Sequence, residues 1–224
     1  MSNPKITEVT WFIVVAVGFV TASCVQSDSS DFDQGALESG PPPGYALRLD
    51  RENRNPADFV AKFDNGDLQV QTGPAGILYR LDQYVDADRF SVHAQFIELD
   101  APIGHREGFG LFIGGQRLNE ASQRYTYFLI RSDGRYLVKQ RDGASTWELS
   151  DGWQPSDAIH IPATGRDDVA NELAITVEGA LVRFECNGES LAVLPSDDVT
   201  VRGIVGVRVN HNLHVQIADF KLEQ

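Results

Sequence analysis

Hydrophobic residues fall at every second position in one segment after another, and this spacing limits the possible folds more than any other feature of the chain. FSVHAQF, residues 90–96, and LAITV, residues 173–177, both show it. Alternate side chains of an extended strand point to opposite faces, so each segment can bury one face and expose the other. No helical periodicity lasts beyond two turns, although NPADFV, residues 55–60, could form one turn. We therefore expect a fold made of half-buried strands.

Turn-forming sequences separate these strands at short intervals. They are DNGD at 64–67, SDGR at 132–135, RDG at 141–143, EG at 178–179 and NG at 187–188. Asn-Gly is a preferred pair for the type I′ turn, which needs a positive φ at both central residues and joins antiparallel strands. A chain of 224 residues, 42% of them hydrophobic, can enclose one sizeable core. Many short antiparallel strands around one core predict two packed sheets or a barrel.

The N-terminal region has the composition of a targeting segment. WFIVVAVGFVTASC, residues 11–24, contains an apolar run as long as a signal-peptide core and shorter than a membrane span. Its end, TASC, resembles the lipobox of bacterial lipoproteins, which implies a signal peptide over residues 1–23 and lipid attachment at Cys24. Ordinary cleavage near Ala22 or Ser23 and an uncleaved single-pass anchor over residues 9–25 are the alternatives.

A linker and a domain follow this segment. Residues 24–44 are rich in Ser, Asp, Gly and Pro, so they cannot bury enough apolar surface to fold and should form a flexible tether. Residues 45–224 would then form the folded domain. The predicted location is the cell envelope, with the domain anchored to a membrane and facing the periplasm or the cell exterior.

Charge and cysteine content exclude two classes of protein. The formal net charge is −13 and the chain has no basic run, which argues against nucleic-acid binding because phosphate backbones require clustered Lys and Arg. Cys24 and Cys186 are the only cysteines, so no disulfide framework holds the fold. Cys186 alternates in phase with Val182 and Phe184, which predicts a core position and not a nucleophile.

One long block resembles a known fold family. YTYFLIRSDGRYLVKQRDGASTWELSDGWQPSDAI, residues 125–159, resembles a recurrent block of bacterial extracytoplasmic domains with the concanavalin A-like lectin/glucanase fold. Residues 63–70 and 86–96 are similar to the opening strands of that family, and residues 171–194 and 203–223 to its closing strands. The resemblance implies an all-β, concanavalin A-like jelly-roll sandwich of two antiparallel sheets over residues 45–224. The family includes lectins, glucanases and laminin G-like modules, so it does not fix an activity.

Two carboxylates test whether the chain is a glucanase. Family 16 glycoside hydrolases of this fold carry Glu-x-Asp-x-x-Glu on one strand, and both glutamates are needed for the retaining mechanism. Glu98 and Asp100 match the first two positions, but Ile103 stands at the third, and Pro102 indicates that the strand has ended. We therefore interpret the two carboxylates as a polar strand end and predict no catalytic residue.

The sequence offers two sets of candidate metal ligands, one of histidines and one of aspartates. His211 and His214 lie in a predicted hairpin tip, and a metal site would need a third ligand. Some members of the fold bind calcium, for which Asp64, Asp67 and Asp219 could supply oxygen ligands. No cofactor is predicted beyond such a structural ion.

Sugar binding on this fold would combine aromatic side chains with polar groups. In the strand at residues 125–131, alternation predicts that Thr126, Phe128 and Ile130 face the core. The opposite face and the following segment supply the candidate carbohydrate-binding residues, which are Tyr125, Tyr127, Arg131, Trp147 and Trp153. For the two tryptophans, a packing role is the alternative.

The sequence predicts an exported, membrane-tethered, non-catalytic domain that binds a polysaccharide or another glycan. A glycan-acting hydrolase of the same fold, including the keto-disaccharide hydrolase type, is one alternative, and it requires acidic or metal-binding residues that converge on one face. A laminin G-like protein-interaction module is the other alternative, and it predicts an exposed apolar patch.

Overall fold

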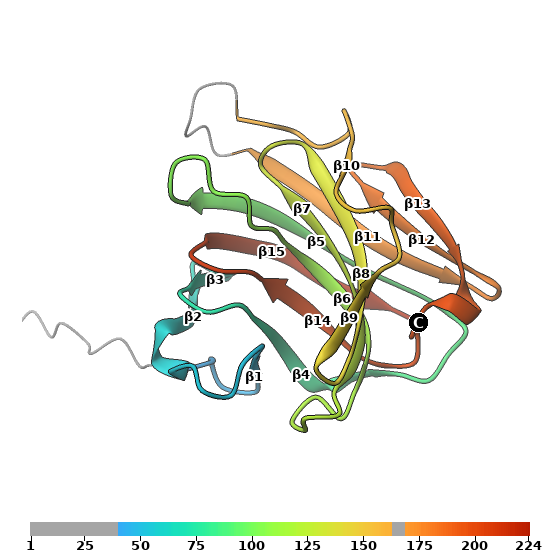
Figure 1. The fold of residues 1–224 in the computed structure, drawn as a ribbon, viewed down its shortest axis with the longest axis horizontal. Coiled ribbons are helices and arrows are strands. Elements are labelled where there is room, and N and C mark those ends of the chain that lie inside the picture. Colours follow the sequence, from blue (N-terminus) through green and yellow to red (C-terminus); the bar gives the residue numbers. More distant parts are fainter. Residues whose placement is uncertain (1–39, 163–168) are drawn as a thin grey trace, which may run out of the picture. The chain divides into compact units, whose positions relative to one another are not determined.

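Two antiparallel β-sheets make up the fold in the computed structural model, which describes residues 40–162 and 169–224 (Figure 1). The predicted signal peptide, Cys24 and the tether up to residue 39 lie outside the described residues. Within the described part of the chain, no helix is long and apolar enough to span a membrane.

The first sheet has eight strands. In spatial order they are β1 (Ala46–Leu49), β4 (Gly76–Val85), β14 (Gly203–Val209), β6 (Phe109–Gln116), β7 (Arg124–Arg131), β8 (Arg135–Asp142) and β10 (Gln154–Pro155), and β9 (Ser145–Glu148) also pairs with β8. Neighbours that are distant in the sequence, such as β14 between β4 and β6, give the sheet its jelly-roll connections.

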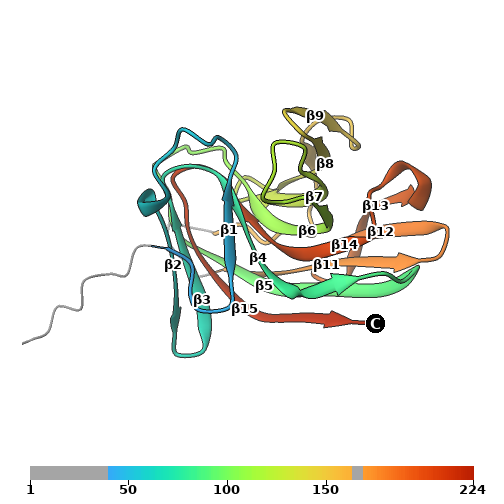
Figure 2. The ribbon, with the colours of Figure 1, turned by 90° about the horizontal axis from the view of Figure 1, so that it is seen from below.

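The second sheet has seven strands and covers one side of the first (Figure 2). In spatial order they are β13 (Glu189–Pro195), β12 (Leu181–Cys186), β11 (Ala170–Glu178), β5 (Arg89–Asp100), β15 (His214–Glu223), β3 (Asp67–Thr72) and β2 (Phe59–Asp64). Two short 3₁₀ helices, η1 (Pro56–Asp58) and η2 (Ser196–Asp198), lie in connections, and η1 is the single turn expected near Asn55.

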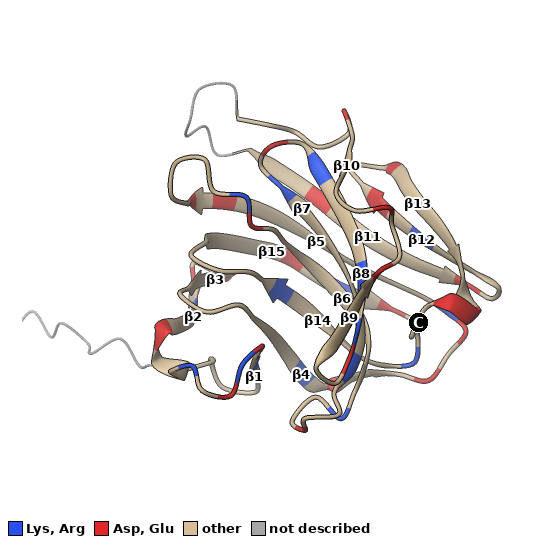
Figure 3. Ribbon diagram, viewed as in Figure 1, with Lys and Arg blue, Asp and Glu red and all other residues tan. Residues whose placement is uncertain are grey.

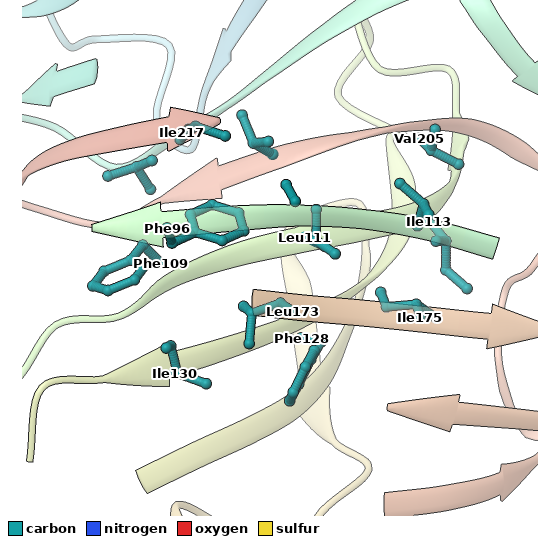
Figure 4. Close-up of a cluster of buried hydrophobic side chains, with 14 of the residues drawn as sticks. Phe96, Phe109, Leu111, Ile113, Phe128, Ile130, Leu173, Ile175, Val205 and Ile217 are labelled. Carbon is teal, nitrogen blue, oxygen red and sulfur yellow. The ribbon is translucent and has the colours of Figure 1, made fainter. Parts of the chain in front are cut away.

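The main core lies between the sheets and contains the alternating residues of the sequence. Phe96 of β5 and Phe109 of β6 meet with ring centroids 5.8 Å apart (Figure 4). The ring centroid of Phe128 of β7 lies 5.7 Å from that of Phe184 of β12. All four side chains are buried, and each fully buried aromatic side chain stabilises the fold by about 1.5–3 kcal/mol. The predicted core assignment of Phe128 and Ile130 is confirmed.

The turn and cysteine predictions are confirmed as well. Asn187 and Gly188 have φ values of 52° and 81°, the left-handed pair that a type I′ turn requires between β12 and β13. Cys186 is fully buried in the core cluster, and burial raises the pKa of its thiol to about 12. A thiol with such a pKa is not a nucleophile near neutral pH.

Candidate functional site

A second buried cluster lies on the outer face of the eight-stranded sheet, which we call the concave face. Its members come from β4, β6, β7 and the loop after β6, and they are Ile77, Tyr79, Phe112, Leu118, Tyr125, Tyr127 and Leu129. The outer face of a sandwich sheet normally contacts solvent. Burial of an aromatic cluster there means that other side chains cover it.

Arginine and aspartate side chains form part of that cover. The Arg208 Cζ atom of β14 lies 4.6 Å from the ring centroid of Tyr127, and Arg208 Nη1 donates a hydrogen bond to Tyr125 Oη at 3.0 Å. Arg208 also binds the Asp50 carboxylate through two hydrogen bonds, of 2.8 and 2.7 Å. The second oxygen of that carboxylate lies 3.1 Å from Arg141 Nη2 of β8. One carboxylate therefore joins two guanidinium groups above the tyrosine rings.

The contact between Asp50 and Arg141 shows that the sheet curves toward this face. Asp50 follows β1 and its backbone N–H still pairs with Ala75, just before β4, so it stays at the edge of the sheet. Five strand spacings separate β1 from β8, which is about 24 Å in a flat sheet. Side chains from these two strands can meet only because curvature and twist bring the sheet edges together.

Electrostatics keep the Asp50 carboxylate ionised. Its burial acts to raise the pKa, but the charge and hydrogen bonds of Arg208, together with Arg141, outweigh this and hold the pKa of Asp50 below its ordinary value. Burial raises the pKa of the Tyr127 hydroxyl to about 12. Near neutral pH the Asp50 carboxylate is therefore ionised and the Tyr127 hydroxyl is protonated, beside the guanidinium groups of Arg208 and Arg141.

A second arginine contact lies beside the end of β7. The Arg131 Cζ atom lies 4.3 Å from the ring centroid of Trp153, and Arg131 binds Asp133 through hydrogen bonds of 3.0 and 2.6 Å. The indole also packs on Gly108, where an added Cβ would lie only 2.7 Å from Trp153 Cη2. Arg135 of β8 donates to the backbone oxygen of Trp153 at 3.0 Å. The absence of a side chain at Gly108 is what allows the indole to lie against the sheet.

The structure brings four of the five sequence-predicted site residues to the concave face. They are Tyr125, Tyr127, Arg131 and Trp153. Tyr125 and Tyr127 are only 0% and 4% exposed, so they form a covered floor and not an open surface. Trp147 lies elsewhere: it is in register with Gln140, a buried residue that bonds Thr126 on the core side of the sheet. Directly opposed residues share a face, so Trp147 points away from the concave face.

Sequence reasoning missed several residues of this face. Arg208 lies between Val207 and Val209 in GIVGVRV, and such a charged residue within a buried strand was the available signal. Asp50 and Arg141 carried no signal because their contact depends on the curvature of the sheet. Tyr84 is in register with Ile204 of the concave face and is 55% exposed, which makes it an accessible aromatic side chain.

The carboxylates of the glucanase-like segment lie elsewhere. Glu98 is in register with the core residue Val215, so its side chain points between the sheets and not to the concave face. Burial raises the pKa of Glu98, against the opposing effects of a Ser132 hydrogen bond and His105. The strand ends at Asp100, as predicted.

The metal-ligand candidates do not come together. Within residues 40–162 and 169–224, no three His, Cys, Asp or Glu side chains form a group that could hold a metal ion. Asp64 accepts a hydrogen bond from Gln69, and Asp67 accepts one from Gln216.

The two packed sheets, their strand order and the concave outer face define a concanavalin A-like jelly-roll sandwich. No family model and no curated protein matches the chain.

Solved structures give the same fold. The carbohydrate binding module CBM66 from Bacillus subtilis matches with a TM-score of 0.60 and 9% identity, over 81% of this chain and 96% of that one. A Bacillus subtilis protein of unknown function with a galectin-like fold matches with a TM-score of 0.56 and 11% identity, over 80% and 89% of the two chains. The potassium-bound Emp46p carbohydrate recognition domain matches with a TM-score of 0.55 and 13% identity, over 80% and 88%. At these identities the likeness establishes the fold alone.

Proposed function

We propose that residues 45–224 form a non-catalytic carbohydrate-binding domain whose ligand lies on the concave face. The observation that carries the proposal is the covered aromatic floor, on which fixed guanidinium groups and one carboxylate are held above Tyr125 and Tyr127. Two of the similar solved structures are named as a carbohydrate binding module and a carbohydrate recognition domain, which supports the same conclusion.

Binding would depend on groups that are already in place. Arg131 is fixed by Asp133, which occupies its Nε and Nη2, and by the Trp153 ring. Its side chain is 10% exposed, so a sugar hydroxyl would meet a guanidinium group already in place, with little loss of side-chain entropy. Tyr84 offers an exposed ring for the apolar side of a pyranose. Tyr125 and Tyr127 support the arginines from below, and they would contact a ligand directly only if Arg208 moved aside. Such preformed contacts suit reversible binding of an extended glycan.

We also propose that the domain is exported and attached to a membrane through a lipid on Cys24, with residues 24–44 as the tether. The TASC sequence supports this arrangement. Intact mass of the chain extracted from membranes tests it. A mass that lacks residues 1–23 and includes acyl chains is expected, whereas an unprocessed chain or a cleaved chain without acyl groups would overturn it.

Affinity electrophoresis of the full-length chain tests the carbohydrate proposal. Gels contain plant, algal or bacterial polysaccharides, and retardation in at least one gel is expected. Tyr84→Ala and Arg131→Ala should reduce it about tenfold, the effect of losing one stacking or charge-assisted contact. Trp147→Ala is the matched control, because Trp147 is 40% exposed but points away from the concave face.

Other results would overturn the proposal in different ways. Retardation that Tyr84→Ala and Arg131→Ala leave unchanged would move the binding site away from the concave face. Release of reducing sugar from a retarding polysaccharide would favour the hydrolase alternative. If no polysaccharide retards the chain, the carbohydrate proposal fails and a protein-interaction module becomes the better explanation.

A further inference from the structure

Charge is distributed unequally between the two outer faces of the sandwich. The concave face carries six cationic side chains, Arg48, Arg131, Arg135, Lys139, Arg141 and Arg208, and the four carboxylates paired with them are Asp50, Glu52, Asp133 and Glu148. The outer face of the seven-stranded sheet, which we call the back face, shows the reverse. It carries the cations Lys62, Arg89, Arg183 and Lys221 and the carboxylates Asp64, Asp67, Glu172, Glu178, Glu185 and Glu223.

This excess of cations runs against the composition of the chain, whose formal net charge is −13. Lysines and arginines appear as blue segments on β7, β8 and β14 in Figure 3. A surface with an excess of one sign of charge attracts ligands of the opposite sign. Because the rest of the molecule repels anions, an anion is directed to this face in particular.

Two of these cations lie on β8 and are less fully paired than the others: Lys139 has one long ion pair, and Arg135 has none among the described residues. Within residues 40–162 and 169–224, Arg135 donates a hydrogen bond to the backbone oxygen of Trp153 and forms no ion pair. Lys139 lies 3.7 Å from a Glu148 oxygen, beyond the range of a strong charge-assisted hydrogen bond. Both side chains are partly exposed, and they retain the capacity to bind another anion.

These cations form a row. Arg135, Lys139 and Arg141 occupy alternate-face positions of one strand, so they all point to the concave face. At about 3.3 Å per residue, the row extends over roughly 20 Å along β8. A single small anion would occupy one of these positions, whereas an extended polyanion can occupy them all.

We infer that the ligand of the concave face is an acidic polysaccharide, with carboxylate or sulfate groups that bind Arg135 and Lys139. This inference rests on the proposed carbohydrate-binding function and specifies its ligand chemistry. The Asp50 carboxylate, bound by Arg208 and Arg141, shows how a carboxylate is accommodated on the same face. A uronate and a sulfated sugar offer the same bidentate acceptor to a guanidinium group, so the experiment must separate them.

Affinity electrophoresis with matched pairs of polysaccharides tests the inference on the full-length chain. Polygalacturonate is compared with its methyl ester, and dextran sulfate with dextran, so each pair shares a backbone and differs in charge. We expect retardation by at least one anionic member to be about tenfold stronger than by its neutral partner, and to weaken as salt is added. The pair that shows the difference identifies carboxylate or sulfate as the recognised group.

Two double variants with the same loss of charge locate the effect. Arg135→Gln with Lys139→Gln should reduce retardation by the anionic polysaccharide about tenfold. Arg183→Gln with Lys62→Gln removes two back-face cations and should leave it unchanged. Equal losses in both double variants would mean that only net charge matters, and this would overturn the inference.

Failure of the inference and failure of the proposed function give different results. In one outcome, neutral polysaccharides retard the chain at least as strongly as anionic ones, and retardation is still lost in Tyr84→Ala. This result would overturn the acidic ligand and leave a carbohydrate-binding concave face. No retardation by any member of either pair, or by any other polysaccharide, would overturn both.

Discussion

The carboxylate of Asp50 should contribute more to stability than its place near the edge of a sheet would indicate. Its partner Arg208 has a side chain only 4% exposed, and Asp50 binds it through two hydrogen bonds while also contacting Arg141. Asp50→Asn keeps the shape of the side chain and removes the charge, so the Arg208 guanidinium loses its counter-ion while it remains buried. Breaking a buried ion pair in this way costs about 3–5 kcal/mol, and partial exposure of Asp50 favours the lower value.

Urea and thermal unfolding followed by circular dichroism measure this effect. A loss of about 3 kcal/mol corresponds to a fall of roughly 6–12 °C in Tm for a domain of this size. Asp64→Asn is the matched control, because Asp64 is exposed and accepts one hydrogen bond from Gln69, and it should cost about 0.5 kcal/mol or less. Adding Arg208→Met to Asp50→Asn removes both charges and should recover most of the loss.

The pH dependence of the same pair has a definite sign. The pKa of Asp50 is lowered in the folded protein, so its contribution is fully present above the unfolded value of about 3.9 and is lost as pH falls through the folded pKa. The stability difference between the wild type and Asp50→Asn should therefore be constant near neutral pH and shrink in acid. A variant within about 0.5 kcal/mol of the wild type at neutral pH would refute this reasoning.

Three further predictions concern local packing. Gly108→Ala should lower the free energy of unfolding by about 2 kcal/mol and shift the Trp153 fluorescence, because the new Cβ would lie 2.7 Å from the indole and 2.8 Å from the Ile130 oxygen. An unchanged spectrum and stability would contradict that packing. Cys186 should resist iodoacetamide at neutral pH, since the thiol is buried and its pKa is about 12, and it should react fully in concentrated guanidinium chloride. Mass spectrometry measures the labelling, and rapid labelling of Cys186 in the native protein would contradict the prediction. Gly188→Ala, at φ 81°, should destabilise the fold by about 1 kcal/mol in urea unfolding, and no loss would exclude the type I′ turn.

The strand faces and the turns could be predicted from the sequence because their determinants are local, whereas the jelly-roll sandwich was implied by the resemblance of residues 125–159 to a known family. Alternation along residues 125–131 separated Thr126, Phe128 and Ile130 from Tyr125 and Tyr127, and the structure has the same division. The Asn187-Gly188 pair needs only its own backbone preference to form its turn. Register within a hairpin then follows from the turn.

The site was less predictable because its contacts join residues that are distant in the sequence. Asp50 and Arg208 are separated by 158 positions, and no local pattern indicates that one would bind the other. Tyr125 accepts a hydrogen bond from the same Arg208 and is fully buried. Alternation could therefore place this tyrosine on the correct face without indicating that it is buried. Trp147 was grouped with Trp153 by sequence proximity, whereas the register of β9 directs its side chain to the other face.

Backbone amide chemical shifts, recorded as an oligosaccharide from a retarding polysaccharide is added, test the location of the site most directly. Binding on the concave face predicts shifts concentrated at Arg131, Lys139 and Arg208, together with the Trp153 indole N–H. Residues of the back face such as Thr176 and Gln95, on the neighbouring strands β11 and β5, should not shift. Shifts confined to β5, β11 and β12, or to loops away from β7, β8 and β14, would contradict the proposed binding face.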